Sequence, residues 1–290
     1  MALSNLAART LFAVVAIPIL IAIVVVGDIA LALLLAVAAG LAAWEYYRIA
    51  AAAREAPMAI VGTVLAALMP LAVHAYRAGY FNPPVIGLGA VIVLIIFALS
   101  IWARGVEGRP IGATATTIFG VLYSGGMLSF AYALRYHNYA VGAAAGTTLL
   151  LYPLVLTWTS DTAAYAVGRA IGRHKLIPSV SPGKTVEGAV GALVVCILVS
   201  WLYARFVLPR FAMLGVAPSW AVIVGVVVSV AVQLGDLAES LIKREAGVKD
   251  SSHLIPGHGG VLDRLDGMLF ALPVAYLLFT FPHVLIPALR

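Results

Sequence analysis

The chain has 290 residues, of which 63% are hydrophobic and only 10% are charged, and its mean hydropathy is +1.06. These values exclude a soluble globular protein, because soluble domains carry about 25% charged residues. The composition therefore indicates an integral membrane protein. Its formal net charge of +6 is interpreted mainly as a signal of membrane topology.

Apolar stretches long enough to cross a bilayer recur along the whole chain, and this argues against a cleaved signal peptide. A membrane helix needs about 20 apolar residues, and the stretches lack the alternation of barrel strands. We predict an all-α, polytopic membrane protein that forms a single domain over residues 1–290. About nine transmembrane helices are expected, with eight as the alternative because Ser124, Gly125 and Gly126 interrupt the fifth. The predicted spans are 8–26, 29–47, 58–76, 85–103, 117–134, 143–160, 188–208, 219–236 and 267–288.

The basic residues are distributed unevenly between the two sets of predicted loops. Thirteen of the 18 Lys and Arg residues fall on the side of the membrane that holds the N-terminus. Because cytoplasmic loops carry the positive excess, we expect a cytoplasmic N-terminus. A basic cytoplasmic face would also attract anionic lipids. The lone Cys196 lies inside a predicted span, so the chain forms no internal disulfide, and this residue is expected to serve packing.

Acidic residues gather in two segments that face the same compartment. Eight of the twelve Asp and Glu residues lie in or beside residues 160–188 and 235–267. Ionisable groups at membrane depth are costly unless they are paired, solvated or bound to an ion, so they indicate a functional site. Glu45 and Glu107, by contrast, look like solvated or paired charges.

The spacing of the acids adds detail. If the eighth span continues as a helix past Gly235, one face carries Asp236, Glu239, Ser240 and Lys243, which are spaced at i, i+3, i+4 and i+7. Asp263 and Asp266 also share a helical face, and Asp161 is expected to end the sixth span. Carboxylates without cysteine favour Mg²⁺ or Mn²⁺ over zinc. In the alternative interpretation, Asp236 and Asp263 only form salt bridges with Lys243 and Arg264.

A glycine-rich run precedes the last predicted span. Gly257, Gly259 and Gly260 surround His258, and such glycines can direct backbone N–H groups toward an anion. Four basic residues accompany this run, so the segment could hold several phosphates beside a metal. An ordinary tight turn is the alternative for the glycines, and a local hydrogen-bonding role is the alternative for His258. The basic residues are Lys243, Arg244, Lys249 and Arg264.

The other polar segment contains "GRAIGRHKLIPSVSPGKTVEG". Its "GKT" resembles the end of a phosphate-binding P-loop, but Pro178 replaces the required glycine and no strand is expected before it, so a P-loop is rejected. Lys184 and Arg169 are candidate phosphate partners, or only charges that set topology. Ser181 and Thr185 could be hydroxyl ligands or could cap a helix that starts close to Thr185.

Two stretches resemble the phosphatidate cytidylyltransferases, also called CDP-diacylglycerol synthases. Residues 240–266, "SLIKREAGVKDSSHLIPGHGGVLDRLD", look like the signature of that family, without a departure at its fixed positions. Residues 160–188, "SDTAAYAVGRAIGRHKLIPSVSPGKTVEG", resemble the preceding loop of the family. The resemblance is sharp over about 160–188 and 235–267 and only general over the first half.

The resemblance implies an enzyme that makes CDP-diacylglycerol and pyrophosphate from CTP and phosphatidate with a divalent metal. It assigns metal binding to Asp236 and Asp263 and other active-site roles to Asp161, Lys184 and Asp266. The cofactor expected is Mg²⁺ or Mn²⁺, with a second cation left open. The expected substrate-binding residues are Arg169, Lys243, Arg244, Lys249, His258, Gly259, Gly260 and Arg264.

The expected setting is a bacterial inner membrane with a cytoplasmic active site, surrounded by membrane lipids and without a nucleic-acid partner. The oligomeric state is open, with a homodimer as one option. An ion-coupled transporter is a competing interpretation, because such proteins also hold carboxylates in broken membrane helices. A CTP-dependent lipid kinase would use similar chemistry but would transfer the γ-phosphoryl group. An alcohol phosphotransferase would need a "DG…AR" motif, which does not follow Asp266 and Gly267.

Overall fold

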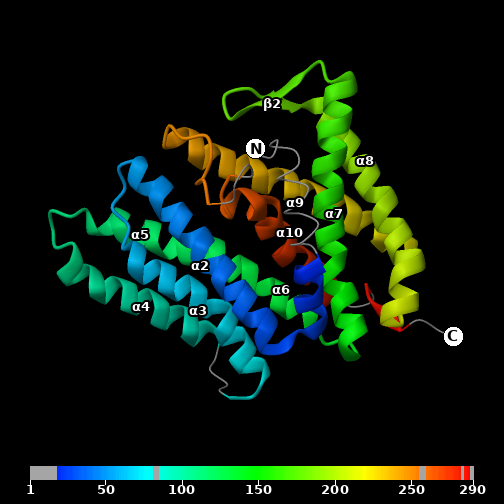
Figure 1. Ribbon diagram of the computed structural model, residues 1–290, viewed down its shortest axis with the longest axis horizontal. Coiled ribbons are helices and arrows are strands. Elements are labelled where there is room, and N and C mark those ends of the chain that lie inside the picture. The colour runs from blue at the N-terminus through cyan, green and yellow to red at the C-terminus, as the bar shows by residue number, and fades with distance from the viewer. Residues whose placement is uncertain (1–17, 81–84, 255–258, 282–283, 288–290) are drawn as a thin grey trace, which may run out of the picture. The chain divides into compact units, whose positions relative to one another are not determined.

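The structure is a computed structural model that describes residues 18–80, 85–254, 259–281 and 284–287. Helices make up most of the described chain, and the strands are confined to two short pairs (Figure 1). The chain divides into two compact units, one built from residues 1–132 and 242–265 and the other from residues 133–241 and 266–290. The fold is that of an all-α membrane protein with small β additions.

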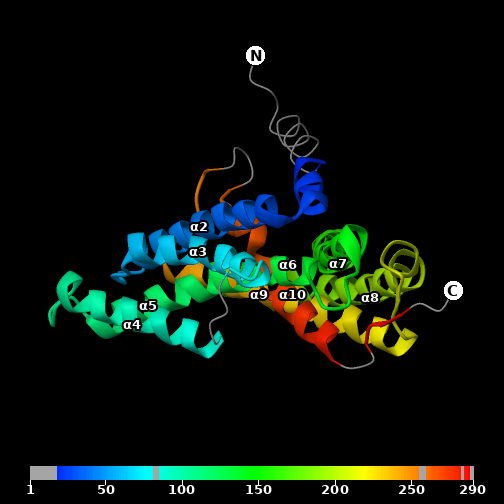
Figure 2. The ribbon, with the colours of Figure 1, turned by 90° about the horizontal axis from the view of Figure 1, so that it is seen from below.

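Unit 1 contains the helices of the first half of the chain. Helices α2 and α3 lie side by side in Figures 1 and 2, and the Tyr47 ring of α2 fills the space that Gly62 and Gly120 leave by lacking a Cβ. The Tyr47 hydroxyl donates to the Thr117 carbonyl at 2.7 Å. The elements are α2 (Asp28–Ala52), α3 (Ala59–Arg77), α4 (Val85–Ala103), α5 (Pro110–Gly120), the π-helical turn η1 (Val121–Gly126) and α6 (Met127–Arg135), which ends in unit 2.

Unit 2 is built around α7 and α8, which lie side by side in Figures 1 and 2. Its core includes Tyr152, whose ring stacks on that of Tyr203 with centroids 4.5 Å apart. The last turn of α9 and the first turn of α10 belong to unit 1. The elements are α7 (Gly142–Ile171), β1 (Lys175–Ile177), β2 (Ser181–Thr185), α8 (Val186–Leu202), the π-helical η2 (Tyr203–Ala212), β3 (Leu214–Gly215), α9 (Pro218–Glu245), α10 (Leu262–Thr280) and β4 (Ile286–Pro287).

Five helical stretches of the described chain are long and apolar enough to cross a membrane. Residues 18–26 are also helical, while most of the first predicted span lies outside the described residues. The interrupted fifth span is helical throughout, because its Ser-Gly-Gly run falls in the π-helical turn η1. The qualifying stretches are Asp28–Ala52, Ala59–Arg77, Pro110–Arg135, Val186–Ala212 and Pro218–Glu245.

Two helices extend beyond the predicted spans in ways that matter for function. Helix α9 continues past Gly235 to Glu245, as the spacing of its polar face required. Helix α7 continues to Ile171, so Asp161 does not lie at a helix end, contrary to the prediction that placed it there. The residues that follow Asp161 include four alanines, which sustain a helix without needing an apolar environment.

Candidate active site

A β-hairpin in unit 2 brings a lysine to the polar face of α9. Strands β1 and β2 pair antiparallel, with Lys175 opposite Thr185 (Figure 1). Lys184, on β2, places its Nζ 2.7 Å from Oδ2 of Asp236, and the two side chains are 25% and 36% exposed. A strand directly precedes the helix here, contrary to the sequence-based argument against a P-loop. The "GKT" residues lie within the strand itself, whereas a P-loop needs a loop at that point.

The junction between the hairpin and α8 is tightly packed. Thr185 caps α8 because its Oγ1 accepts a hydrogen bond from the Gly188 amide at 3.1 Å, as the helix-cap interpretation predicted. A Cβ at Gly168 would lie 2.9 Å from the same Oγ1, and one at Gly188 would lie 2.7 Å from the Ala164 carbonyl oxygen. Glycines therefore allow α7 and α8 to approach each other at the base of the hairpin.

A cavity of about 430 Å³ lies within unit 2 beside the Lys184–Asp236 pair. Its lining joins two basic residues, Lys184 and Arg169, with two carboxylates, Asp161 and Asp236. Hydroxyls of Ser160 and Ser181 add neutral oxygen donors. The cavity can thus offer cations to phosphate oxygens and hard oxygen ligands to a metal ion.

Asp266 is placed next to α9 through its backbone. A Cβ at Gly235 would lie 2.5 Å from the Asp266 carbonyl oxygen, so the glycine permits close contact between α9 and α10. The carboxylate of Asp266 accepts a hydrogen bond from the Gly267 amide at 2.7 Å. This contact puts Asp266 against the residue that precedes Asp236.

In unit 1, Asp263 is surrounded by hydrogen-bond donors. Lys243 Nζ lies 2.6 Å from its Oδ1. Its Oδ2 accepts from the Ser251 amide at 3.0 Å, the Ser251 hydroxyl at 2.8 Å and the Gly260 amide at 2.8 Å. The Asp263 side chain is only 8% exposed and that of Lys243 12%. The salt-bridge interpretation named Lys243 and Arg264 as partners, and the structure pairs Lys243 with Asp263 but Lys184 with Asp236.

Glu45 on α2 is fully buried, so the solvated alternative in the prediction of a solvated or paired charge is wrong. Its carboxylate accepts four hydrogen bonds at 2.5 to 3.0 Å. The donors are the hydroxyls of Ser251 and Ser252 and the amides of Val261 and Leu262. Buried carboxylates are stable only when their oxygens are satisfied in this way.

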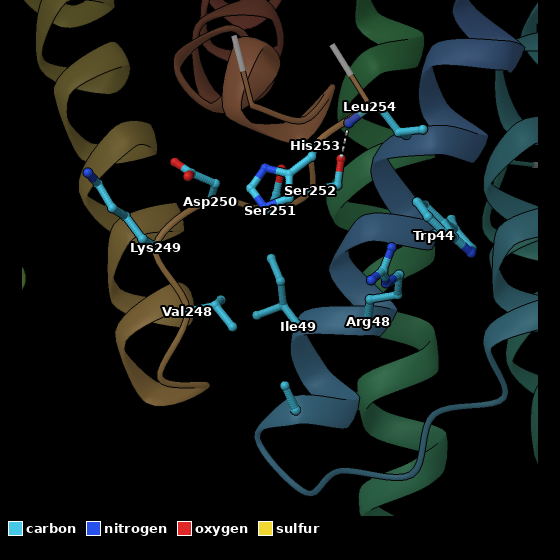
Figure 3. A pocket seen from close by; sticks show the side chains of 11 residues that line it. Trp44, Arg48, Ile49, Val248, Lys249, Asp250, Ser251, Ser252, His253 and Leu254 are labelled. Carbon is cyan, nitrogen blue, oxygen red and sulfur yellow. Dashed lines mark hydrogen bonds between the residues drawn. The ribbon is translucent and has the colours of Figure 1, made fainter. Parts of the chain in front are cut away.

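A second cavity, of about 620 Å³, lies in unit 1 between α2 and the segment that follows α9. Figure 3 shows Trp44 and Arg48 on the α2 side, with Lys249 and Asp250 across the cavity and His253 beside Ser252. The Arg48 guanidinium lies over the Trp44 ring, 4.7 Å from its centroid. This cavity has a mixed polar and apolar lining and borders the same serines that contact Glu45.

A family model described as the cytidylyltransferase family matches residues 7–281. The chain belongs to the cytidylyltransferase family. It is 45% identical to a phosphatidate cytidylyltransferase of Haemophilus influenzae over 141 residues, which is 48% of each protein. It is 41% identical to the Bacillus subtilis phosphatidate cytidylyltransferase over 133 residues, 46% of this chain and 48% of that protein. The matched part of the chain thus spans about half the length of these curated relatives.

Three of the predicted substrate-binding residues of this cytidylyltransferase-family chain lie on its surface, whereas Gly260 is buried. Arg244, Lys249 and Arg264 are exposed, and Arg244 donates to the Val248 carbonyl at 3.4 Å. Gly259 has a φ of 80°, which favours glycine, and a Cβ there would lie 2.6 Å from Asp263 Oδ2. The predicted role of His258 falls outside the described residues.

The two carboxylates predicted to bind the metal, Asp236 and Asp263, already have hydrogen-bond and ion-pair partners. Asp236 has an ammonium group at 2.7 Å and the Ser240 hydroxyl at 3.5 Å. The cavity beside it also holds the Asp161 carboxylate and the Ser160 and Ser181 hydroxyls, although a metal ion at Asp236 would have to replace the Lys184 ammonium. That donor set fits Mg²⁺ or Mn²⁺. A carboxylate offers about four lone-pair sites. Those of Asp263 are mostly taken by its lysine, amide and hydroxyl partners, so few remain for a metal. Among the described residues, three or more His, Cys, Asp and Glu side chains do not gather in one metal-binding group.

The sequence did not identify Glu45, Ser251 and Ser252 as residues whose hydrogen bonds hold the signature segment, residues 240–266, in place. Glu45 lies more than 200 residues from its partners along the chain. The available signal was a lone carboxylate inside an apolar run, "GLAAWEYY", because such a group must find donors when it is buried.

Proposed function

We propose that the chain is a phosphatidate cytidylyltransferase. It would transfer CMP from CTP to phosphatidate, giving CDP-diacylglycerol and pyrophosphate. The observation that carries this proposal is the cavity of unit 2, where Lys184, Arg169, Asp161 and Asp236 line one space in a cytidylyltransferase-family chain. The printed names of the relatives support the choice of lipid substrate.

In the proposed reaction, a phosphate oxygen of phosphatidate attacks the α-phosphorus of CTP. A new phosphorus–oxygen bond forms to the lipid, the bond to the β-phosphate bridge breaks, and pyrophosphate leaves. A general base is unnecessary because a phosphate monoester, with a second pKa near 6, is already largely ionised at pH 7. The main catalytic task is to hold and neutralise several converging negative charges.

The residues of the cavity are suited to that task. Lys184 is already paired with a carboxylate, and an incoming phosphate can replace that partner because both side chains are partly exposed. Arg169, whose Nη1 donates to the Tyr165 hydroxyl at 2.9 Å, presents a planar guanidinium for phosphate oxygens. We assign these two cations to the phosphate groups, with Lys243, Arg244, Lys249, Arg264 and the glycines at 259 and 260 retained as proposed substrate contacts.

We also propose Mg²⁺ or Mn²⁺ as cofactor, held by Asp236 with Asp161 nearby. When bound, the ion would stabilise negative charge on the nucleotide phosphates. The sequence also assigns Asp263 to the metal, and this assignment remains a proposal. A cation there would have to replace the Lys243 ammonium.

The proposed topology follows the basic residues and keeps all nine spans. The N-terminus and the polar segments 160–188 and 235–267 would face the cytoplasm of a bacterial cell, with the chain in the inner membrane as a single domain. CTP would then arrive from water while the acyl chains of phosphatidate stay in the leaflet. Labelling of single introduced cysteines with a membrane-impermeant reagent in intact cells and in inverted vesicles tests this orientation.

The function is tested with purified protein in detergent micelles that contain phosphatidate, CTP and Mg²⁺. Mass spectrometry of the lipid fraction should find CDP-diacylglycerol, and pyrophosphate should appear in equal amount. Lys184→Met should reduce both products together. A folded wild-type preparation that forms neither product overturns the proposal. Turnover without an ion gradient also separates an enzyme from a transporter.

A further inference from the structure

Glu45 has a position that the proposed chemistry does not explain. It lies on α2, in the half of the chain that resembles the family only in general terms, and its side chain is fully buried. A buried charge is costly unless it is matched by donors. A carboxylate at such a position can perform a task that an apolar residue could not, because it accepts several hydrogen bonds at once.

The contacts of Glu45 join two places on the signature segment. Ser251 and Ser252 donate their hydroxyls to Glu45 at 3.0 and 2.5 Å, just after α9. Val261 and Leu262 donate their amides at 3.0 and 2.7 Å, at the start of α10. One carboxylate thus fixes both ends of the connection from residue 251 to residue 262.

Gly260 shows how closely the segment follows this carboxylate. A Cβ on Gly260 would lie 2.5 and 2.6 Å from the two Glu45 oxygens and would also collide with the Ser251 hydroxyl. The second glycine of the "HGG" run is therefore required by the approach of Glu45. This gives part of the signature a structural cause inside unit 1.

Ser251 transmits the position of Glu45 to Asp263. Its Oγ lies 3.0 Å from Glu45 Oε2 and 2.8 Å from Asp263 Oδ2. A hydroxyl has one proton, so it donates to one of these carboxylates at a time and lies between both. The Ser251 amide also donates to Asp263, at 3.0 Å. A shift of the Glu45 contacts would move the donors that orient Asp263.

We propose that Glu45 is a positioning residue for residues 251–254 and 259–263, and that it acts by holding Ser251 and Ser252 together with Val261 and Leu262 and by fixing the donors around Asp263. It is not assigned any contact with substrate. The inference rests on the proposed function for its effect on turnover, but its effect on the order of the segment is independent of that function.

The test uses Glu45→Gln, which keeps the size of the side chain. A glutamine offers one acceptor oxygen and an NH₂ group that faces two of the four donors. Residues 251–254 and 259–263 should become more mobile, and their misplacement should lower kcat about 10-fold or more. Ser252→Ala should lower the free energy of unfolding less in the Glu45→Gln variant than in the wild type, because the alanine then removes a donor that has already lost its partner.

A spin label on Leu254→Cys reports the segment without any turnover. Leu254 is 48% exposed, whereas the natural cysteine, Cys196, is buried, so the label should attach at position 254. We expect a mobile spectrum in Glu45→Gln and an ordered one in the labelled parent.

Tyr47→Phe is the matched control. Tyr47 lies two residues away on the same helix, is also buried, and the variant loses one hydrogen bond, to the Thr117 carbonyl. It should lower the melting temperature but leave both kcat and the spectrum at 254 unchanged. The inference is overturned if Glu45→Gln keeps the ordered spectrum, or if its kcat loss is no greater than that of the control at equal loss of stability. A wild type without turnover would overturn the proposed function instead, and the spectrum would then decide the inference alone.

Discussion

Two lysine–aspartate pairs, one in each unit, have nearly the same length but different surroundings. Lys184 and Asp236 are 2.7 Å apart and are 25% and 36% exposed. Lys243 and Asp263 are 2.6 Å apart and are 12% and 8% exposed. Asp236 faces a cavity, whereas Asp263 accepts hydrogen bonds from two backbone amides and a hydroxyl in addition to its lysine.

The length of an ion pair alone therefore does not determine its role. Exposed pairs contribute about 0–1 kcal/mol to stability. The Lys184–Asp236 side chains are only partly exposed and the Lys184 Nζ itself is covered, but this pair should still open for a ligand at a lower cost than the more deeply buried Lys243–Asp263 pair. A buried pair leaves an uncompensated charge when it is broken. The Lys243–Asp263 pair is therefore expected to hold the fold of unit 1, whatever else Asp263 does in the reaction.

Asp263→Asn should have the largest effect, because it acts on stability and turnover together. It leaves the ammonium group of Lys243 buried without its counter-charge, which costs about 3–5 kcal/mol, and CDP-diacylglycerol formation should almost vanish. Circular dichroism melts in detergent measure the first effect and product mass spectrometry the second. An unchanged melting temperature would contradict the structural role of Asp263, and equal turnover would remove it from the metal assignment.

Asp236→Asn should lower turnover without a large loss of stability. We expect turnover to fall about 100-fold, as when a key electrostatic group is removed from an active site, with a stability loss below about 1 kcal/mol. Labelling of the buried Cys196 by a thiol-reactive dye during heating reports the unfolding of unit 2. A stability loss as large as that of Asp263→Asn would abolish the distinction between the pairs.

Lys184→Met should act mainly on the nucleotide. We expect KM for CTP to rise about 10-fold, because one charge-assisted contact to phosphate is lost, while stability stays within about 1 kcal/mol. Initial rates over a range of CTP concentrations give KM, and Arg173→Met, an exposed residue outside the cavity lining, is the control. Equal KM in Lys184→Met and wild type would exclude a phosphate role for Lys184.

Salt should produce the smallest effect. At 0.5 M salt, screening should remove most of the coupling between Lys184 and Asp236, about 0.5 kcal/mol, and should leave the coupling between Lys243 and Asp263 nearly intact. Double-mutant cycles of thermal stability at low and high salt measure both couplings. Similar salt sensitivity of the two pairs would show that their environments do not differ as described.

The helices of the fold could be predicted because apolar stretches of membrane length specify them directly. The β1–β2 hairpin could not, since its Pro178 and Pro182 weaken any strand pattern. Asp161, Lys184 and Asp236 could be predicted as site residues from their charge and from the family resemblance. The structure places all three along one cavity. Glu45 was misjudged because its donors are set by tertiary contacts, which local sequence does not reveal.

The proposed function is tested most directly with CTP that carries tritium in the cytosine ring and phosphorus-32 in the γ-phosphate. Phosphatidate, Mg²⁺ and purified wild-type protein are added, and both labels are counted in the extracted lipid. CMP transfer predicts tritium in the lipid and phosphorus-32 only in pyrophosphate. Lipid that holds phosphorus-32 without tritium would identify a lipid kinase and contradict the proposal.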